Sequence, residues 1–342
     1  MKPFLRNIAA AVALTLSSAA ALAQSYPTRV ITLVVPFAAG GPSDAVARHI
    51  AQSMSETLKQ QVIIENVAGV GGNTGAARVA KAQPDGYTIL IHHVALAAGT
   101  SLYKSLPFDT LKDFAPLGLV NFGPMVLVSK KDYPANDAKE ILAKLKAEGP
   151  KTTLAHAGVG SNSHLCALLL QQALGSKLTE VAYRGTGPAM TDLMGGQVDV
   201  LCDQTTNAVS QINGNTIKAY AVTSRNRLDV LRNLPTMIEA GLPDFEFVIW
   251  PGLYAPKDTP KNIVDELNTA LKVAVADPTV RARFAEVGTE VFPTDELTPE
   301  AHKARLEKEV AKWRDVVAKA GISIGNRMDS HCDLRDESAP PA

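Results

Sequence analysis

The sequence predicts an α/β protein built of two domains. Short β-branched runs alternate with amphipathic segments along most of the chain, a pattern typical of strands alternating with helices. The 342 residues are more than one hydrophobic core usually serves, which favours two domains. Stretches near 121–124 and 250–252 look like crossings between them. A chain that leaves one domain, builds a second and returns has two hinge strands and a cleft.

The N-terminal segment has the features of an export signal. Lys2 and Arg6 precede an uncharged, mostly apolar run over residues 8–22, and Ala21-Leu22-Ala23 is typical of a signal-peptidase site. The run is short for a membrane-spanning helix and no stop-transfer pattern follows it, which favours a cleaved signal over an anchor. We therefore predict cleavage after Ala23 and a periplasmic protein without membrane insertion.

The charge balance indicates which partners to expect. The chain has 34 Lys and Arg against 34 Asp and Glu, and residues 1–23 carry two positive and no negative charges, so the processed chain has a net charge of 0 − 2 = −2. Nucleic-acid binding needs a basic face, and attraction to a membrane surface needs a basic tract. The sequence shows neither feature, so we expect neither nucleic acid nor a membrane surface as a partner.

The first part of the chain is predicted to contain three strands separated by helices. The β-branched run over 30–35 is the first strand. Apolar residues four positions apart give the helix that starts at Pro42 a single buried stripe, which consists of Val46, Ile50, Met54 and Leu58. The remaining elements expected here are strands over 62–64 and 87–91 and a helix over 73–82 that ends before the turn Pro84-Asp85-Gly86.

The rest of the chain first repeats this alternation and then becomes helical. We expect strands over 125–128, 153–155, 178–183, 198–201 and 217–222, and helices over 138–146, 161–170, 261–275, 278–286 and 299–320. The strands should be mainly parallel. We predict a first domain of residues 24–121 plus 251–325 and a second of 122–250, followed by a polar, aperiodic and disordered tail over 326–342.

Four polar or glycine-rich stretches leave predicted strands, where ligands of α/β proteins collect. The first, residues 36–44, contains Gly40 and Gly41, at which the backbone can approach a ligand closely. Free N–H groups and the helix dipole there favour an anion, although a plain strand–turn–helix connection would use the same residues. The other three stretches are 158–164, 183–188 and 202–206. If the four converge on one cleft, two of them can hold the two ends of a diacid.

The patterns of several enzyme classes are missing or incomplete. The sequence contains neither GxxxxGK[ST] nor GxSxG, and residues 69–75 nearly fit GxGxxG but have Thr74 in place of the third glycine. Ser161 and His164 lie on one helix face without an evident acid, so helix capping is the expected role of Ser161. Asp44 and Asp203 are alternative candidates for a catalytic acid pair, but capping or orienting the backbone is the expected role of each. We expect no enzymatic activity and no cofactor.

Two histidines and three cysteines complete the candidate residues. Neighbouring residues of a strand face opposite sides, so His92 and His93 do not form a metal pair, and we expect one of them, taken as His93, at the cleft as a hydrogen-bond donor. The sequence has no Cys or His spacing typical of a metal site. Cys166 and Cys202 belong to one predicted domain and are either a disulfide or two buried thiols. Cys332 lies in the tail and should be unpaired.

Together these stretches resemble the Bug family, the extracytoplasmic receptors of tripartite tricarboxylate transporters. The match covers nearly the whole processed chain up to about Ile324, so the tail is a departure from the family pattern. The order and spacing of the motifs carry the resemblance. The motifs are Tyr26-Pro27, residues 34–44, Glu65-Asn66, 71–73, 84–88, 112–114, 163–165, 195–199, 221–224 and 239–243.

The resemblance implies a type II periplasmic-binding (Venus-flytrap) fold with two hinge strands that closes on a small carboxylate. The ligand is a mono-, di- or tricarboxylate, aliphatic or aromatic, and the partner is a membrane permease of one large and one small subunit. We expect a monomer. A sensor that presents its loaded form to a signalling system is the alternative function. The ligand-binding residues that the resemblance implies are Phe37, Ala39, Gly40, Gly41, Ser43 and Asp44 in the first domain and Gly160, Ser161, Asn162, Thr186, Gly187 and Asp203 in the second.

Overall fold

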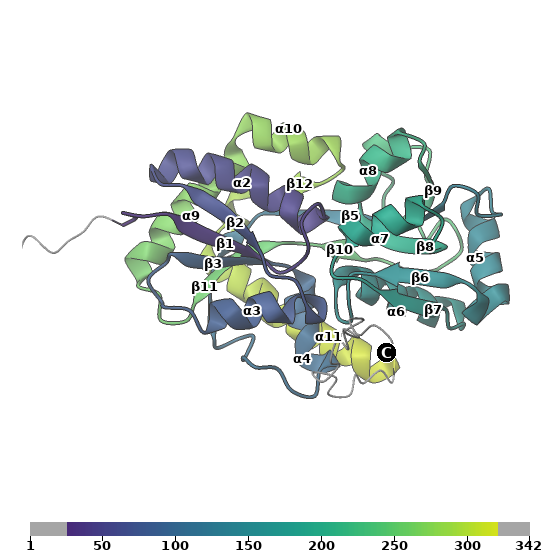
Figure 1. Ribbon diagram of the computed structural model, residues 1–342, viewed down its shortest axis with the longest axis horizontal. Helices are drawn as coiled ribbons and strands as arrows, with labels where there is room; N and C mark the ends of the chain where they lie inside the picture. Colours follow the sequence, from purple (N-terminus) through teal and green to yellow (C-terminus); the bar gives the residue numbers. More distant parts are fainter. Residues whose placement is uncertain (1–25, 321–342) are drawn as a thin grey trace, which may run out of the picture.

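The computed structural model describes residues 26–320 and contains two mixed β-sheets, each with its own helices (Figure 1). We call each sheet with its helices a lobe. The predicted signal segment, the tail and Cys332 lie outside the described residues. None of the helices within residues 26–320 combines the length and the apolar character that crossing a bilayer requires.

The first lobe contains a five-stranded sheet. In order across the sheet, the strands are β2 (Val62–Asn66), β1 (Ile31–Val35), β3 (Thr88–His92), β11 (Gly252–Pro256) and β4 (Phe114–Leu119). β1 pairs in parallel with β2 and β3, whereas β11 runs antiparallel to both of its neighbours. All five residues of β11 are buried, so the sheet continues into the return segment without a break in the core.

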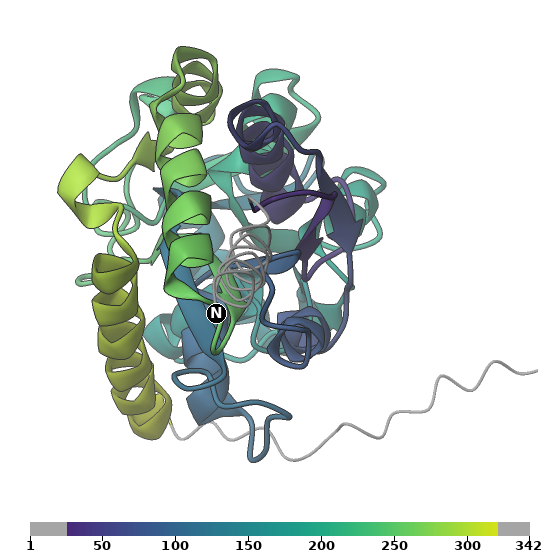
Figure 2. The same ribbon diagram turned by 90° about the vertical axis from the view of Figure 1, so that its left-hand side faces the viewer.

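Helices cover this sheet and connect its strands. They are α2 (Pro42–Leu58), α3 (Asn73–Ala80), α4 (Val94–Leu102), α9 (Lys261–Ala276), α10 (Pro278–Glu286) and α11 (Pro299–Ala320). α11 packs against α4 and β4, and α9 packs against α2 and β4. Figure 2 shows α9 and α11, in green and yellow, at one side of the molecule. These two late helices therefore belong to the first lobe.

The second lobe contains a seven-stranded sheet. Its strands are β5 (Asn121–Lys130), β6 (Thr153–His156), β7 (Thr179–Ala182), β8 (Val200–Gln204), β9 (Ile217–Val222), β10 (Val248–Ile249) and β12 (Glu290–Val291). β6 is parallel to β7 and β8, while β5 is antiparallel to β8, β9, β10 and β12. The helices of this lobe are α5 (Ala138–Glu148), α6 (Asn162–Leu174), α7 (Thr186–Met194) and α8 (Thr205–Asn213).

The chain crosses between the lobes at two neighbouring places, from β4 to β5 and from β10 to β11, and it reaches the second sheet once more at β12, which pairs with the start of β5. The crossings lie side by side because β10 pairs with β5 and β11 pairs with β4, and the Val120 N–H donates to the Pro251 carbonyl at 2.9 Å. These positions coincide with the stretches 121–124 and 250–252 singled out in the sequence. We propose that the lobes are the two domains whose boundaries the sequence predicts.

The predicted α/β class is confirmed, and the apolar stripe of α2 is buried as expected. The prediction of mainly parallel strands is wrong for β5 and β11. Both strands follow a crossing rather than a helix of the same sheet, so neither is part of a strand–helix–strand unit that would impose parallel pairing. Two elements were not predicted from the sequence. The helix α4 is apolar all round and has no amphipathic period, and the strand β4 contains Pro116 and Gly118, which are unusual inside strands.

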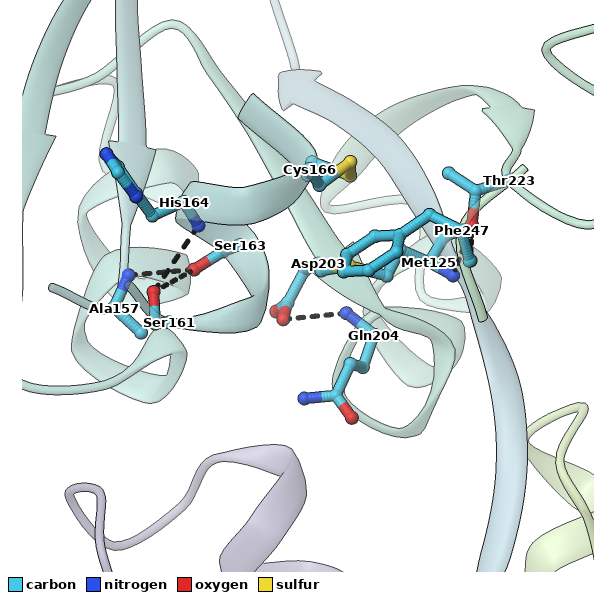
Figure 3. Close-up of a disulfide and its surroundings, with 11 residues drawn as sticks. Met125, Ala157, Ser161, Ser163, His164, Cys166, Asp203, Gln204, Thr223 and Phe247 are labelled. Atoms are coloured by element: carbon cyan, nitrogen blue, oxygen red, sulfur yellow. Dashed lines mark hydrogen bonds between the residues drawn. A yellow bond between two sulfur atoms is a disulfide. The ribbon is translucent and has the colours of Figure 1, made fainter. Parts of the chain in front are cut away.

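A disulfide joins Cys166 of α6 to Cys202 of β8, with both residues fully buried (Figure 3). The two cysteines are 36 residues apart, so the bond closes a long loop in the unfolded chain. A cross-link of this length removes much of the conformational entropy of that loop.

Replacing both cysteines with alanine should lower the free energy of unfolding by about 3 to 4 kcal/mol, the loss that loop-closure entropy predicts for this separation. Denaturant titration of the oxidised wild type and the double variant measures this difference. Wild type reduced with dithiothreitol in denaturant and titrated in its presence should match the variant. Equal midpoints for all three samples would contradict a stabilising disulfide.

Candidate ligand-binding site

A cavity lies between the lobes, where strand exits of both sheets meet. Its volume between atoms is about 290 Å³. The residues that line it come from the first-lobe loop after β1, from the start of α4 and from four segments of the second lobe. They are Phe37, Gly41, Pro42, Ser43, His93, Met125, Ala157, Ser161, Asn162, Ser163, Thr186, Asp203 and Gln204.

Several helices begin at this cavity. α2, α6 and α7 start at Pro42, Asn162 and Thr186, which all line it, and Gln204 is the residue before α8. The N–H groups of a first helical turn have no partner within the helix, and the helix dipole places partial positive charge there. No lysine or arginine is among the lining residues. The cavity therefore favours an anion through main-chain dipoles and neutral side chains.

The first-lobe loop is held in shape by Asp44 of α2. Its carboxylate accepts the Gly40 N–H at 3.1 Å, two bonds from the Arg48 guanidinium at 2.9 and 3.0 Å, and a bond from the Asn66 amide at 3.0 Å. Burial opposes ionisation of Asp44, but these hydrogen bonds outweigh burial and lower its pKa. The same Asn66 amide donates to the carbonyl of Phe37 at 3.0 Å. Asp44 thus shapes the loop, and it is not among the residues that line the cavity.

The loop after β6 is tied together by hydroxyl groups (Figure 3). The Ser163 hydroxyl accepts the Ala157 N–H at 2.8 Å and lies 3.2 Å from the Ser161 hydroxyl, which accepts the His164 N–H at 3.3 Å. Ser161 is therefore the N-cap of α6, as expected from the sequence. Because the Ser161 hydroxyl caps the helix and His164 is turned toward the loop, the two side chains do not form a nucleophile–base pair.

Three side chains beside this loop are close enough to be considered as metal ligands. Ligand atoms of His156, His164 and Glu180 lie within 4.8 Å of one another. However, the Nδ1 atoms of the two histidines accept the N–H groups of Gly158 and Gly160, each at 3.1 Å. In the neutral rings the proton is then on Nε2, and both Nε2 atoms face Glu180 at 3.8 and 3.5 Å. This group holds the loop and offers no free ring nitrogen to a metal.

Asn162 is the clearest sign that the cavity takes a polar ligand. Asn162 lines the cavity and is 2% exposed, and neither its amide nitrogen nor its side-chain carbonyl oxygen has a hydrogen-bond partner within residues 26–320. A buried amide with both polar atoms unpaired costs free energy that a bound partner would recover. The amide can donate to a ligand oxygen and accept from a ligand hydroxyl or a water molecule.

Asp203 places a carboxyl group in the same cavity. It is completely buried at the end of β8 and accepts the Gln204 N–H at 2.8 Å and a bond from the Asn207 amide. Burial raises the pKa of Asp203 to about 6, because the hydrogen bonds from Asn207, Gln204 and Thr186 offset only part of the cost of burying the charge. Near neutral pH this group can gain or lose a proton in response to a small change in its surroundings.

Phe37 and His93 form the first-lobe wall opposite these groups. Their rings stack with centroids 5.1 Å apart. Burial holds the pKa of His93 well below its usual value, so the ring is neutral and its Nδ1 accepts the Ala95 N–H at 3.4 Å. Its Nε2–H is therefore available as a donor. This geometry fits the expectation that His93, rather than His92, is a hydrogen-bond donor at the cavity.

The lobes touch on both sides of the cavity. The Ala38 N–H donates to the Arg184 carbonyl at 3.1 Å, and the Tyr103 hydroxyl donates to the Val159 carbonyl at 2.5 Å. A Cβ atom on Gly71 would fall 1.9 Å from the carbonyl oxygen of Val159, so this contact needs a glycine. The arrangement is a closed one, in which the walls of the cavity come from both lobes.

The structure brings together most of the residues that the sequence singles out. Of these, Phe37, Gly41, Ser43, His93, Ser161, Asn162, Thr186 and Asp203 line the cavity. The other five do not: Asp44 and Gly40 form the loop bond described above, and Ala39, Gly160 and Gly187 lie behind the wall or at the lobe contact. Their role as ligand-binding residues stays a prediction.

Five lining residues were not expected from the sequence. Pro42, Ser163 and Gln204 stand within the singled-out stretches, so their neighbours could have indicated them. Met125 lies in β5 and Ala157 directly follows β6, and the pairing of β5 with β8, which sets Met125 opposite Gln204, places Met125 at the cavity. No local signal in the sequence marks such a residue.

Comparison with known proteins identifies the family. Residues 46–322 match the tripartite tricarboxylate transporter family receptor, TctC. A UPF0065 protein of Agrobacterium vitis is 48% identical over 297 residues, which cover 87% of this chain and 86% of that protein.

Solved structures agree with the sequence match. The fold is similar to that of the periplasmic binding protein BugD, with a TM-score of 0.86 and 46% identity over 87% of this chain and 100% of that one. It is also similar to MatC from Rhodopseudomonas palustris with bound malate (TM-score 0.83, 40% identity, 85% and 100% covered) and to a second R. palustris protein with adipate (0.83, 31%, 88% and 100%). The chain therefore belongs to the Bug (TctC) family of solute-binding receptors.

Proposed function

We propose that the protein is a periplasmic receptor that captures a small aliphatic dicarboxylate and delivers it to the membrane permease of a tripartite tricarboxylate transporter. The observation that carries this proposal is a cavity without a cation at which several helices begin and into which the unpaired Asn162 amide points. Main-chain and amide donors of this kind suit carboxylate oxygens.

Size and relatives support the same ligand class. The space between the lobes, about 290 Å³ even when solvent-open space is counted, suits a short-chain acid better than a large cofactor. The similar structures from R. palustris contain malate and adipate, both linear dicarboxylates. We propose an acid of four to six carbons, enclosed when the lobes rotate about the paired crossings between β4 and β5 and between β10 and β11.

The site also supports binding without catalysis. The hydroxyls of Ser161 and Ser163 are engaged with each other and with loop N–H groups, and His164 accepts the Gly160 N–H. An activated nucleophile would instead have its hydroxyl within reach of a free ring nitrogen. We propose that the protein releases its ligand chemically unchanged. We also propose that the predicted N-terminal signal directs the protein to the periplasm, where it binds this ligand.

A valine in place of Gly41 should abolish binding while the protein still folds. Gly41 has an extended backbone that any residue can adopt, but a Cβ atom there lies 3.6 Å from the Gly187 nitrogen of the other lobe, so added methyl groups fill the gap between the lobes. Calorimetry with malate, succinate, glutarate and adipate on refolded, ligand-free protein measures the effect. We expect the wild type to bind at least one of these acids and Gly41→Val to bind none.

Ala143→Leu is the matched control, because it also adds three carbons but on an exposed position of α5. It should keep wild-type affinity. Unchanged affinity in Gly41→Val would show that the ligand binds elsewhere, and a wild type that binds none of the acids would overturn the proposed ligand class.

Leucine at position 162 should separate binding from stability. The side chains have nearly the same shape, so Asn162→Leu removes two unpaired buried polar atoms and should leave the melting temperature unchanged or raise it. It also removes the amide that we assign to the ligand, so affinity should fall at least about tenfold. Asn262→Leu, on the exposed face of α9, serves as the control. A lower melting temperature with full affinity would contradict this role.

Affinity should fall as pH rises from about 6 to 8, because an ionised Asp203 repels a carboxylate in the same cavity. In the free protein the pKa of Asp203 is raised to about 6, and a bound anion raises it further, so above pH 6 binding must take up a proton. The loss approaches tenfold per pH unit at most. Asp203→Asn should bind equally well at pH 6 and pH 8 in calorimetry.

Other groups near the cavity do not produce this pH dependence. His93 is neutral throughout the range because burial lowers its pKa, and Asp44 stays ionised because its hydrogen bonds lower its pKa. A wild type whose affinity is constant from pH 6 to 8 would show that Asp203 does not approach the ligand anion.

A further inference from the structure

A second cavity adjoins the ligand cavity. It has a volume between atoms of about 230 Å³ and shares one lining residue, Gln204, with the first cavity. Its lining residues are Val46, Asn121, Gly123, Pro124, Gln204, Thr205, Thr206, Ile249, Pro251 and Thr289. We call it the hinge chamber, because several of these residues belong to the crossings between the lobes.

Three chain segments pass directly from one cavity to the other. On α2, Ser43 lines the ligand cavity and Val46, three residues later, lines the hinge chamber. On β5, Met125 lines the former and Pro124 the latter. From β8 into α8, Asp203 lines the former and Thr205 the latter, with Gln204 between them. The two spaces are therefore neighbours along the gap between the lobes, and Gln204 lines both of them.

The lining of the hinge chamber is mainly apolar, but three of its buried polar groups lack partners within the part of the chain that the structure describes. The side-chain oxygens of Asn121, Thr205 and Thr206 are buried and have no hydrogen-bond partner within the described residues. Water cannot replace the missing partners easily, because Asn121 and Thr205 are only 1% and 0% exposed. Native proteins leave few such groups unpaired, and each has a cost that a bound polar group removes. These unpaired atoms indicate a bound polar group, and this evidence is independent of the shape of the cavity.

The donors in the hinge chamber suit a carboxylate. Thr205 and Thr206 form the first turn of α8, a nine-residue helix whose N-cap residue, Gln204, makes no side-chain capping bond. The unpaired N–H groups of this turn and the two threonine hydroxyls can donate to an anionic group, and the Asn121 side-chain oxygen, an acceptor, can take a bridging water. Asn121 is held in place by its amide, which donates to the Thr289 hydroxyl at 3.0 Å.

The geometry points to a two-part site: the ligand cavity holds one carboxylate, the hinge chamber receives the distal carboxylate of longer acids, and Gln204 sets the length that is accepted. This inference rests on the proposed function and adds to it a residue that determines specificity. With the Gln204 side chain between the two parts, four-carbon acids fit in the ligand cavity, whereas six-carbon acids need the side chain to be displaced.

Calorimetry with succinate and adipate on three variants tests the inference. Gln204→Ala opens the boundary, so the affinity for adipate relative to succinate should rise about tenfold over the wild-type ratio, the gain from one charge-assisted hydrogen-bonded group. Adding Thr205→Val to Gln204→Ala should remove most of this gain and leave the affinity for succinate unchanged. Gln204→Asn, which shortens the side chain by one methylene, should give an intermediate ratio and replaces Gln204→Ala if that variant does not fold.

Two control variants replace a glutamine and a threonine at positions away from the gap between the lobes. Gln197→Ala and Thr269→Val are exposed substitutions and should keep the wild-type ratio. An unchanged ratio in both Gln204 variants, or an equal loss of succinate and adipate binding on adding Thr205→Val, would overturn the inference while leaving the proposed function in place. A wild type that binds neither acid would overturn the proposed function and this inference with it.

Discussion

The proposed function sets one constraint for the site: an anion has to be enclosed between two lobes without a cation among the residues that line the cavity. Unpaired N–H groups at helix starts meet this constraint, because their dipoles are fixed by the fold and carry no net charge that must be desolvated in the empty protein. The requirement explains why the cavity lies where strands end and α2, α6, α7 and α8 begin. It also explains why the first-lobe loop is shaped by Asp44 and Arg48, an ion pair that lies beside the cavity and not in it.

Enclosure by main-chain groups requires the two backbones to approach each other closely. The contacts of Gly71 with Val159 and of Gly187 with Gly40 leave no room for a Cβ atom to fit without a shift. Only when the lobes meet in this way do donors from both of them reach a small ligand at once. Binding energy from both walls then becomes available only in the closed state, which is the differential affinity that drives closure.

The sequence predicted the parts of the fold that are set by local patterns. The apolar stripe of α2 and the strand–glycine–helix connections are local, and they led to the α/β class and to the four stretches that contain ten of the thirteen residues that line the cavity. The individual binding residues within these stretches were implied by the family resemblance. The missing parts are set by tertiary pairing. Met125 reaches the cavity because β5 crosses beside β8, and the hinge chamber exists because α2, β5 and α8 run side by side. Neither relation leaves a periodic trace in the sequence.

The disulfide connects stability to this arrangement. Cys166 lies four residues after Asn162 on α6, and Cys202 directly precedes Asp203 on β8, so the bond joins the two elements that present the unpaired amide and the buried carboxyl group. The second-lobe wall is thus covalently fixed, while the Asp44 network fixes the first-lobe wall. With both walls rigid, the gap can open mainly at the paired crossings, next to the hinge chamber. A ligand group bound in that chamber would therefore contact the segments that move most, and would stabilise the closed state more strongly than its small size suggests.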